Sequence, residues 1–567
     1  MRKALLILLL ALMCPIFALA EDFCVMPADK PGPLIATGQP ISAISVWHDG
    51  DEAYLFLPSY IDASRLRVSL PEGATVDMDG TTLRDGDVTA LMQPGRTLTV
   101  TTQKRAYSLT VLQSANIPAL FLATASGESD YIHQDKAHRE PGALLMVSPD
   151  GAIAYNGGLN QLRIRGNTTS QYEKKPYQFK LEDKTALIGQ DKARSWALLA
   201  NYIDHSLLRN TLALTLSEAV GLPSVPDSAP VDVYLNNAYM GSYLLCETVS
   251  VGSGRVDIAD LAEATEAVNA VLPKDAPLIS GSNWRMILHL WFATRGWSPT
   301  PNFWQAADMP HDPADITGGY LLEIGIKRDW DEKPSRFVTS SGWPLVVREP
   351  EYASVAQMNY IRGLFQRLDN ALSDPETGWE ALQGLVDVDS FVRKYVLEEL
   401  LINYDGGTGS QYFYKDSDKR DPLIYCGPPW DYDNTLGVNE TVSDPDRFYV
   451  QTRQHSPSAM FPRLWAIPAF RDAAMASYRE DFRPLLDALL GNEPSDSLPS
   501  IADSARLIEA SAAMNFIRWP IDYSFHPRVR NTGNTWVENV DDLLSFLTQR
   551  VQFLDEAWQE SISKDKP

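Results

Sequence analysis

Short stretches that alternate between apolar and polar residues dominate the first part of the chain. Turn signals such as Asp49-Gly50 and Pro94-Gly95 separate them, and their two-residue period is typical of half-buried strands. The stretches cover residues 41–47, 52–58, 66–70, 96–102 and 106–112. This spacing predicts a small all-β sandwich, of the immunoglobulin-like (Ig-like) kind, over residues 21–115. It contains no catalytic pattern, so a spacer or adhesion module is the default interpretation.

A second strand-rich region follows over residues 116–260. The expected strands cover residues 159–170, 174–182, 229–237 and 241–249. The Asn236-Asn237 pair between the last two is typical of a hairpin turn. A helix is predicted over residues 204–220, because Asp204 is a suitable cap and Gly221-Leu222-Pro223 ends it. The pattern predicts a β-rich lobe with one helix.

The rest of the chain is mainly helical. Residues 261–315 are interpreted as an insertion, with a helix expected at 278–297, and strands at 318–326 and 344–350 return to the core. Beyond residue 350 apolar residues recur at three- and four-residue spacing, as in core-facing helices. The expected helices cover residues 352–372, 388–403, 468–490, 504–517 and 540–558. We therefore predict an α+β, bilobal protein with a mainly helical lobe at about 350–560.

Residues 1–20 have the parts of an export signal peptide. Arg2 and Lys3 precede an apolar run, and Ala18-Leu19-Ala20 supplies a small-x-small cleavage site before Glu21. The apolar run is too short for a membrane span, so we expect no transmembrane segment in the mature chain. The predicted location is periplasmic, or extracellular at the cell surface.

The chain is acidic, with a formal net charge of −24. Nonspecific nucleic-acid binding needs a basic surface, so we exclude a nucleic-acid partner. The charge favours partners with basic protein segments, although it is equally typical of plain solubility. The cysteines after residue 20, which are Cys24, Cys246 and Cys426, lack the spacing of a zinc site. Export permits disulfides, so one bridge and buried thiols are alternatives.

The most informative polar pattern lies in residues 401–437. Asp405 follows an apolar run, the amide of Gln411 comes next, and a strand-like segment then leads into Asp431 and Asp433. Phosphoryl transfer needs such groups, because one carboxylate orients the attacking hydroxyl while an amide and another carboxylate hold the metal that bridges the phosphates. Asp is also common in turns, so an ordinary loop is the alternative.

Basic side chains on two expected strands are candidates for binding phosphates. Strand alternation places Lys180 on the face opposite Phe179, and Lys175 lies just before this strand. Arg165 alternates with apolar neighbours and precedes a glycine whose backbone could approach a phosphate. An ordinary solvated strand face is the alternative for each. Arg209, on the expected helix, is either a cleft residue or a structural ion-pair partner.

Eight short blocks resemble, in order, the spore coat protein H (CotH) kinase family. They are RIRGNTT (163–169), KKPY (174–177), WALLANY (196–202), LLRN (207–210), GLP (221–223), GSYLL with the following Glu247, GGYLLE (318–323) and PWDYD (429–433). The resemblance covers roughly residues 116–560. It implies an atypical protein-kinase-like fold that transfers phosphate from ATP to Ser or Thr of proteins.

The resemblance also implies roles for individual residues. Asp405 would orient the substrate hydroxyl, and Asp431 would bind the metal. Glu247 would lie where the chain crosses between lobes beside the adenine, as a hinge residue of the nucleotide site. The nucleotide-binding set would also include Arg165, Lys175, Lys180 and Arg209.

Two positions depart from the family, and the resemblance also suggests one pair of cysteines. The family usually has Asn where Gln411 stands as second metal ligand, and the extra methylene is expected to weaken the site. Asp433 is often Asn in the family, and its added charge would attract a second cation. In kinase-like folds the segments of Cys246 and Cys426 line one adenine pocket, which makes this pair the candidate disulfide.

The sequence thus leads to the hypothesis of an exported, ATP- and Mg²⁺- (or Mn²⁺-) dependent Ser/Thr protein kinase. The expected partners are a protein substrate with basic segments and a surface partner for the N-terminal β domain. The alternative is a catalytically weak or inactive CotH-like protein that acts by binding or adhesion.

Overall fold

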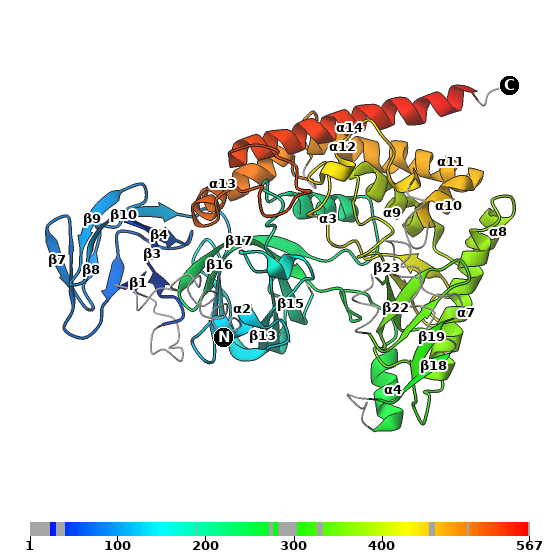
Figure 1. Ribbon diagram of the computed structural model, residues 1–567, viewed down its shortest axis with the longest axis horizontal. Coiled ribbons are helices and arrows are strands. Elements are labelled where there is room, and N and C mark those ends of the chain that lie inside the picture. Colours follow the sequence, from blue (N-terminus) through cyan, green and yellow to red (C-terminus); the bar gives the residue numbers. More distant parts are fainter. Residues whose placement is uncertain are drawn as a thin grey trace, which may run out of the picture.

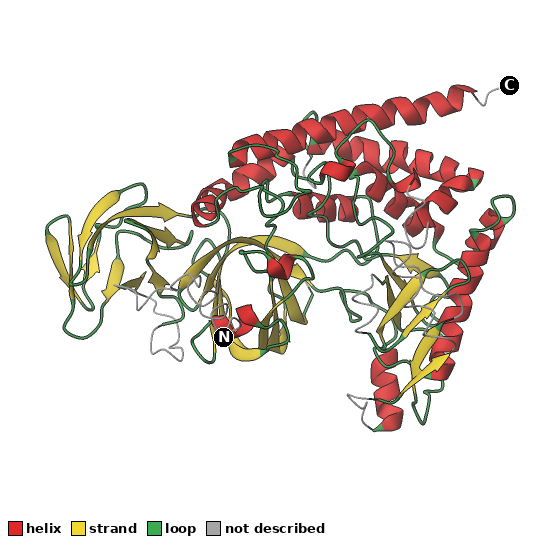
Figure 2. Ribbon diagram, viewed as in Figure 1, coloured by secondary structure: helices red, strands yellow, loops and turns green. Residues whose placement is uncertain are grey.

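A computed structural model describes residues 23–29, 40–189, 191–270, 276–281, 303–325, 333–452, 460–495 and 498–564. The expected export signal lies outside these residues. Along the chain, an N-terminal pair of sheets is followed by a closed barrel and a second large sheet, and a layer of helices runs over the barrel (Figure 1). Figure 2 shows the strands and helices of this α+β architecture by colour. No described helix is long and apolar enough to cross a membrane.

The N-terminal residues form two sheets around one core. One sheet has the order β2-β1-β5-β8, made of β2 Ile44–Ser45, β1 Cys24–Pro27, β5 Leu66–Ser69 and β8 Val88–Thr89. The other has the order β3-β4-β10-β9-β6-β7, made of β3 Trp47–Asp49, β4 Glu52–Leu57, β10 Ala106–Gln113, β9 Thr97–Thr101, β6 Thr75–Met78 and β7 Thr81–Arg84. Val25 of the first sheet and Leu109 of the second belong to one buried cluster. The expected strands are confirmed, and the Ig-like topology stays a prediction.

This N-terminal unit is packed firmly on the barrel. The rings of Phe56 and Tyr239 lie 4.7 Å apart, and the Tyr234 hydroxyl donates to the Phe56 carbonyl at 3.1 Å. The side-chain amide of Asn237 donates to the carbonyls of Pro40 and Ala43. Ring packing and hydrogen bonds therefore join the N-terminal unit to the barrel.

The second region closes into a barrel with the order β11-β12-β13-β14-β15-β17-β16. Its strands are β11 Ala119–Thr124, β12 Glu140–Val147, β13 Ile153–Ile164, β14 Tyr177–Thr185, β15 Ala193–Leu199, β16 Ser228–Leu235 and β17 Ala238–Glu247, with α2 Asp130–Gln134 between β11 and β12. Asn236 and Asn237 have φ values of 48° and 72°, as the predicted two-residue hairpin turn requires.

Alternation along β13 and β14 decides which side chains leave the barrel. Leu162, Tyr177 and Phe179 are fully buried in the barrel core, whereas Arg165 is half-buried and Lys180 is exposed. The predicted alternation is confirmed for β14, whereas the strand expected over residues 159–170 ends at Ile164, directly before Arg165. The basic residues consequently lie outside the barrel, where they are available to other parts of the chain.

A second sheet has the order β18-β19-β21-β22-β20-β23-β24. Its strands are β18 Leu278–Gly281, β19 Trp304–Ala307, β20 Tyr320–Ile324, β21 Arg336–Val338, β22 Pro344–Glu349, β23 Tyr412–Lys415 and β24 Ile424–Cys426. The helix expected at 278–297 is wrong at its start, because residues 278–281 pair with β19; residues 282–297 lie outside the described residues. The expected insertion therefore supplies β18 and β19 to this sheet.

The five helices predicted in the C-terminal half are confirmed among the ten described α-helices that follow β15, of which α7 packs against β19 and β21. The ten are α3 Arg209–Ala219, α4 Leu261–Asn269, α7 Val355–Ala371, α8 Gly378–Gln383, α9 Val388–Leu400, α10 Met460–Ala466, α11 Pro468–Ser477, α12 Arg483–Leu489, α13 Ile501–Arg518 and α14 Trp536–Lys564. Short turns η1 Thr169–Gln171, η2 Glu440–Val442 and η3 Val450–Thr452 and the π-helical η4 Tyr478–Phe482 complete the set. The helix expected from residue 204 begins instead at Arg209.

None of the described cysteines forms a disulfide. Cys246 and Cys426 are buried in different apolar clusters, so the disulfide considered for this pair is not formed. Burial raises the pKa of both thiols. The candidate bridge was wrong because β17 and β24 face different parts of the core.

The buried ammonium of Lys174 makes a pH-dependent contribution to stability. Its Nζ donates to the Ser242 carbonyl and lies 4.6 Å from the centre of the Tyr243 ring. Burial lowers its pKa to about 7, although nearby Asp232 acts in the opposite direction. A lysine in the unfolded chain keeps its proton up to about pH 10.4.

We expect this lysine to make the free energy of unfolding rise with pH above 7. There the unfolded chain binds more protons than the folded chain, so the slope reaches up to about 1.4 kcal/mol per pH unit. Lys174→Met keeps the apolar stem and removes the titration, and its unfolding free energy should lack this slope. Denaturant unfolding of both proteins between about pH 7 and pH 8.5, below the ionisation of exposed thiols, measures the difference. Parallel curves would contradict the lowered pKa.

Candidate active site

The loop that follows α9 holds Asp405 through its backbone. The Asp405 amide donates to the Asn403 side chain at 3.0 Å, and its carbonyl accepts from the amides of Thr408 at 2.8 Å and Gly409 at 3.1 Å. These bonds form a tight turn directly after a buried helix end. The Asp405 side chain is half-buried, so an incoming group can reach it.

The second carboxylate comes from residues 430–436, here called the acidic loop. Asp431 has a φ of 71°, a left-handed conformation that is uncommon outside glycine. Its Oδ2 accepts from the Ser410 hydroxyl at 3.1 Å. The Leu436 amide donates to the Leu401 carbonyl at 2.8 Å. Together with the bond from the Tyr404 amide to the Asn434 carbonyl at 3.3 Å, these hydrogen bonds join the acidic loop to the segment that carries Asp405.

The carboxylates of these two segments act on one another. Asp433 is buried, and burial raises its pKa well above the usual value. The charges of Asp431, Asp405 and Asp204 raise it further, while Arg165 acts in the opposite direction. The structure therefore brings together Asp405, Asp431 and Asp433, as the sequence predicted, and adds Asp204, which the sequence analysis treated only as a helix cap.

Arg165 connects the barrel to the acidic loop. Its guanidinium carbon lies 5.2 Å from the centre of the Trp430 ring, directly before Asp431. The segment that follows Arg165 also lies near the carboxylates. Burial and the charge of Asp433 raise the pKa of Tyr172, in this segment, to about 12. Gly166 begins this segment with a φ of 84°, which favours glycine. A basic side chain and a tight loop thus lie beside the acidic groups.

The two predicted lysines are placed differently. Lys175 is half-buried, and its Nζ donates to the Ser170 carbonyl at 3.1 Å, so it braces the segment after Arg165. Lys180 is exposed on β14, where its register partners are Gln161 and Ser195. Of Arg165, Lys175 and Lys180, Arg165 is the one whose charge lowers the pKa of Asp433.

Arg209 has a structural role in this arrangement. Its guanidinium is 1% exposed and bonds to Asp204 Oδ1, to the Thr435 carbonyl at 3.0 Å and to the Leu436 carbonyl at 3.3 Å. The next residue, Asn210, accepts from the Tyr432 amide at 2.8 Å. Structural pairing was one of the two interpretations of Arg209, and these contacts favour it over nucleotide binding. Asn210 was missed, because its partner lies far away in sequence.

Glu247 is likewise occupied by the protein. Its Oε1 lies 3.4 Å from Arg255 Nε, and its Oε2 accepts from the Asp227 amide at 3.3 Å. The chain leaves the barrel at this residue and continues toward α4, in accordance with a hinge position. Beside it the outer barrel face meets the second sheet in an apolar cluster that includes Cys246, Tyr412 and Trp430.

Gln411 turns its amide away from the acidic loop. Its Nε2 donates to Cys426 Sγ at 3.3 Å and to the Tyr412 carbonyl at 3.1 Å, and the side chain is 2% exposed. The neighbouring Ser410 is the residue that contacts Asp431. The predicted ligand and the observed contact therefore differ by one position along the chain.

The donor set suits a cation that completes its coordination with other oxygens. No group of three His, Cys, Asp or Glu side chains in the described part of the chain is arranged to hold a metal ion. Mg²⁺, however, is commonly bound by one or two carboxylates together with phosphates and water. Asp431 and Asp433 supply two such carboxylates, and a cation there would relieve the repulsion that raises the pKa of Asp433.

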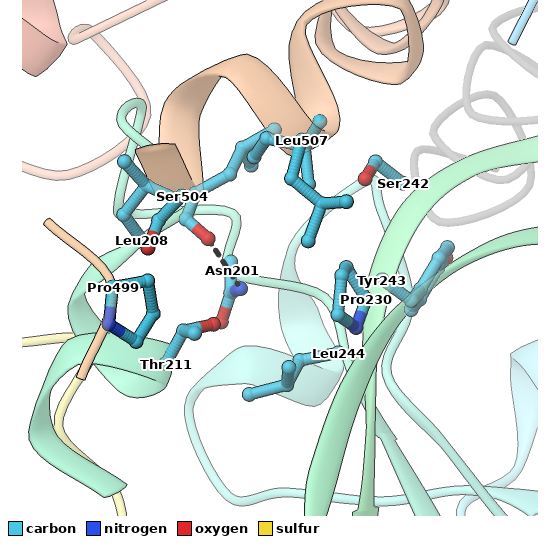
Figure 3. A pocket seen from close by; sticks show the side chains of 12 residues that line it. Asn201, Leu208, Thr211, Pro230, Ser242, Tyr243, Leu244, Pro499, Ser504 and Leu507 are labelled. Carbon is cyan, nitrogen blue, oxygen red and sulfur yellow. Dashed lines mark hydrogen bonds between the residues drawn. The ribbon is translucent and has the colours of Figure 1, made fainter. Parts of the chain in front are cut away.

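One mainly apolar cavity, beside α3, lies apart from these carboxylates. It encloses about 90 Å³ between α3, β16, β17 and α13, and its lining is mainly apolar (Figure 3). Asn201 reaches it and donates to the Leu207 carbonyl at 3.4 Å, while its Oδ1 accepts from Asn210. The cavity thus borders the network behind the acidic loop and contains none of the acidic side chains.

The model of the CotH kinase protein family matches residues 162–554, about two thirds of the chain, and the chain belongs to this family. Membership implies a kinase-like fold and a phosphotransferase activity that uses ATP. The match includes both segments that carry the carboxylates. A search of curated proteins gives no match.

Replacing Arg209 separates a structural role from nucleotide binding. Arg209→Met removes one partner of a buried ion pair, so we expect the free energy of unfolding without nucleotide to fall by about 3–5 kcal/mol. The matched control is Lys180→Met, an exposed basic residue, whose change should stay within about 0.5 kcal/mol. Denaturant unfolding measures both. Weaker ATP binding with unchanged stability in Arg209→Met would restore the nucleotide-binding interpretation.

Proposed function

We propose that this member of the CotH kinase family is an exported, ATP- and Mg²⁺-dependent protein kinase that phosphorylates Ser or Thr. The observation that carries the proposal is the meeting of Asp405, Asp431 and Asp433 with Arg165 between the barrel and the helical layer. Export rests on the sequence of residues 1–20 alone, and a periplasmic or cell-surface location follows from it.

Each group would have a distinct task. Asp405 would accept a hydrogen bond from the substrate hydroxyl and orient it. Asp431 and Asp433 would hold Mg²⁺ or Mn²⁺, and Arg165 would balance phosphate charge. When bound, ATP would supply the phosphoryl group and its metal would neutralise negative charge on the phosphates. Lys175 would support the loop beside the phosphates, and the apolar cluster between barrel and second sheet is where we expect the adenine.

A protein substrate with basic segments fits the charge of the site. Apart from Arg165, the groups that act on Asp433 are carboxylates, and the whole chain has a formal charge of −24. Basic residues flanking the phosphorylated hydroxyl would be attracted to this region.

The second candidate is a CotH-like binding protein with weak or no activity. The turned amide of Gln411 favours it, because the expected second metal ligand does not face Asp431. The N-terminal β unit would then present a binding surface. Catalysis remains the better supported function, since the carboxylates themselves are brought together.

Replacing the two carboxylates tests the kinase directly. Asp405→Asn and Asp431→Asn keep size and remove charge, and we expect each to lower ³²P incorporation from γ-labelled ATP into a basic protein substrate by at least about 100-fold. Thermal unfolding of each variant without nucleotide is the control for folding. Equal labelling in the wild type and both variants would contradict the assigned roles.

Nucleotide-dependent stabilisation separates the two candidate functions. For the kinase, Mg·ATP at 100 times its dissociation constant should raise the free energy of unfolding by about 2.7 kcal/mol. The stabilisation should be lost in Asp431→Asn. A binding protein without a nucleotide site should show no change with Mg·ATP, Mn·ATP or either metal alone.

A further inference from the structure

The residue that contacts Asp431 is Ser410, whereas the sequence pattern predicted its neighbour Gln411. Gln411 stands where the family usually has the metal-binding amide, yet its Nε2 donates to Cys426 Sγ and the Tyr412 carbonyl. Ser410 donates its hydroxyl proton to Asp431 Oδ2 at 3.1 Å. The oxygen that accompanies Asp431 in this chain is therefore a hydroxyl.

We propose that Ser410, instead of Gln411, is the uncharged protein ligand of the divalent cation at Asp431 and Asp433. The inference rests on the proposed function, because the cation is the one that would accompany ATP. It assigns to the site a residue that the sequence pattern did not single out.

The chemistry of a hydroxyl supports this assignment. A Ser oxygen carries two lone pairs besides its proton, so it can donate to Asp431 and still offer a lone pair to a cation. Ser and Thr hydroxyls serve as Mg²⁺ ligands in other phosphoryl-transfer enzymes. Ser410 is half-buried, and its φ of 50° belongs to the tight loop that carries Asp405.

Gln411 is held in its present place by the fold. It precedes β23, and its carbonyl accepts from the Ile324 amide at 2.9 Å, which fixes its backbone to β20. Turning the side chain toward Asp431 would break its bonds inside a region where the amide is 2% exposed. Leaving these buried groups without their hydrogen-bond partners would be unfavourable. Ser410 needs no such rearrangement.

The expected pattern of metal binding is specific. Mn²⁺ affinity of the mature chain is measured by electron paramagnetic resonance, with Mn²⁺ alone and with Mn²⁺ plus a non-hydrolysable ATP analogue. Ser410→Ala should weaken Mn²⁺ binding about tenfold or more. Ser410→Asn should recover most of it, because Asn tolerates positive φ and supplies an amide oxygen. Gln411→Leu, which keeps the buried bulk, should change it by less than about twofold.

A matched hydroxyl on the same loop controls for loop damage. Thr408 Oγ1 donates to the Asp405 carbonyl at 3.0 Å and contacts no acidic side chain, so Thr408→Ala should leave Mn²⁺ affinity unchanged. Weaker binding in Gln411→Leu with normal binding in Ser410→Ala would overturn the inference and keep the metal site. Equal binding in wild type and Asp431→Asn would instead remove the proposed function itself.

Discussion

The site depends on the hydrogen bonds and the ion pair of the buried Arg209 guanidinium. An arginine cannot lose its charge, so burial at 1% exposure requires partners on every side. It bonds to Asp204, in the turn before α3, and to the carbonyls of Thr435 and Leu436, more than 200 residues away in sequence. The acidic loop can therefore take only the position that α3 allows.

This constraint explains how repelling carboxylates stay together. Asp405, Asp431 and Asp433 would separate in an unrestrained chain, since each charge raises the free energy of the others. The bond from the Tyr432 amide to Asn210 and that from the Leu436 amide to the Leu401 carbonyl hold the acidic loop against this repulsion. Repulsion among these carboxylates thus lowers the stability of the fold locally, and a bound cation would relieve it. Local destabilisation of this kind is common in functional sites.

The sequence indicated the candidate chemical groups more readily than the residues that support them. Asp405, Asp431 and Arg165 could be singled out because their patterns are local: a carboxylate after an apolar run, or a basic residue that alternates with apolar ones. Their roles in the site stay a prediction. The roles of Arg209, Asn210 and Ser410 depend on which loop meets which helix end, and no local period contains this information. The direction of the Gln411 side chain also depends on tertiary contacts, because its amide donates to the buried Cys426 thiol and does not contact Asp431.

The same division applies to the fold. Strand alternation and helical spacing identified most elements, but closure of the barrel comes from the parallel pairing of β11 with β16, which only the complete structure shows. The apolar run from residue 278 was misread as a helix at its start, because a short apolar segment has no period that separates a buried helix from an edge strand. Its pairing with β19 decided the matter.

Hydrogen bonds attach the barrel to α13 and to Trp519 directly after it. Asn515 of α13 accepts from the Ser242 amide, Ser511 donates to Asp232, and Trp519 donates to the Met240 carbonyl, all in buried or half-buried surroundings. Rotating the barrel away from α13 would break these bonds at a cost of about 1 kcal/mol or more each. The barrel is therefore fixed against α13, and with it Arg165, which directly follows β13 and lies beside Trp430.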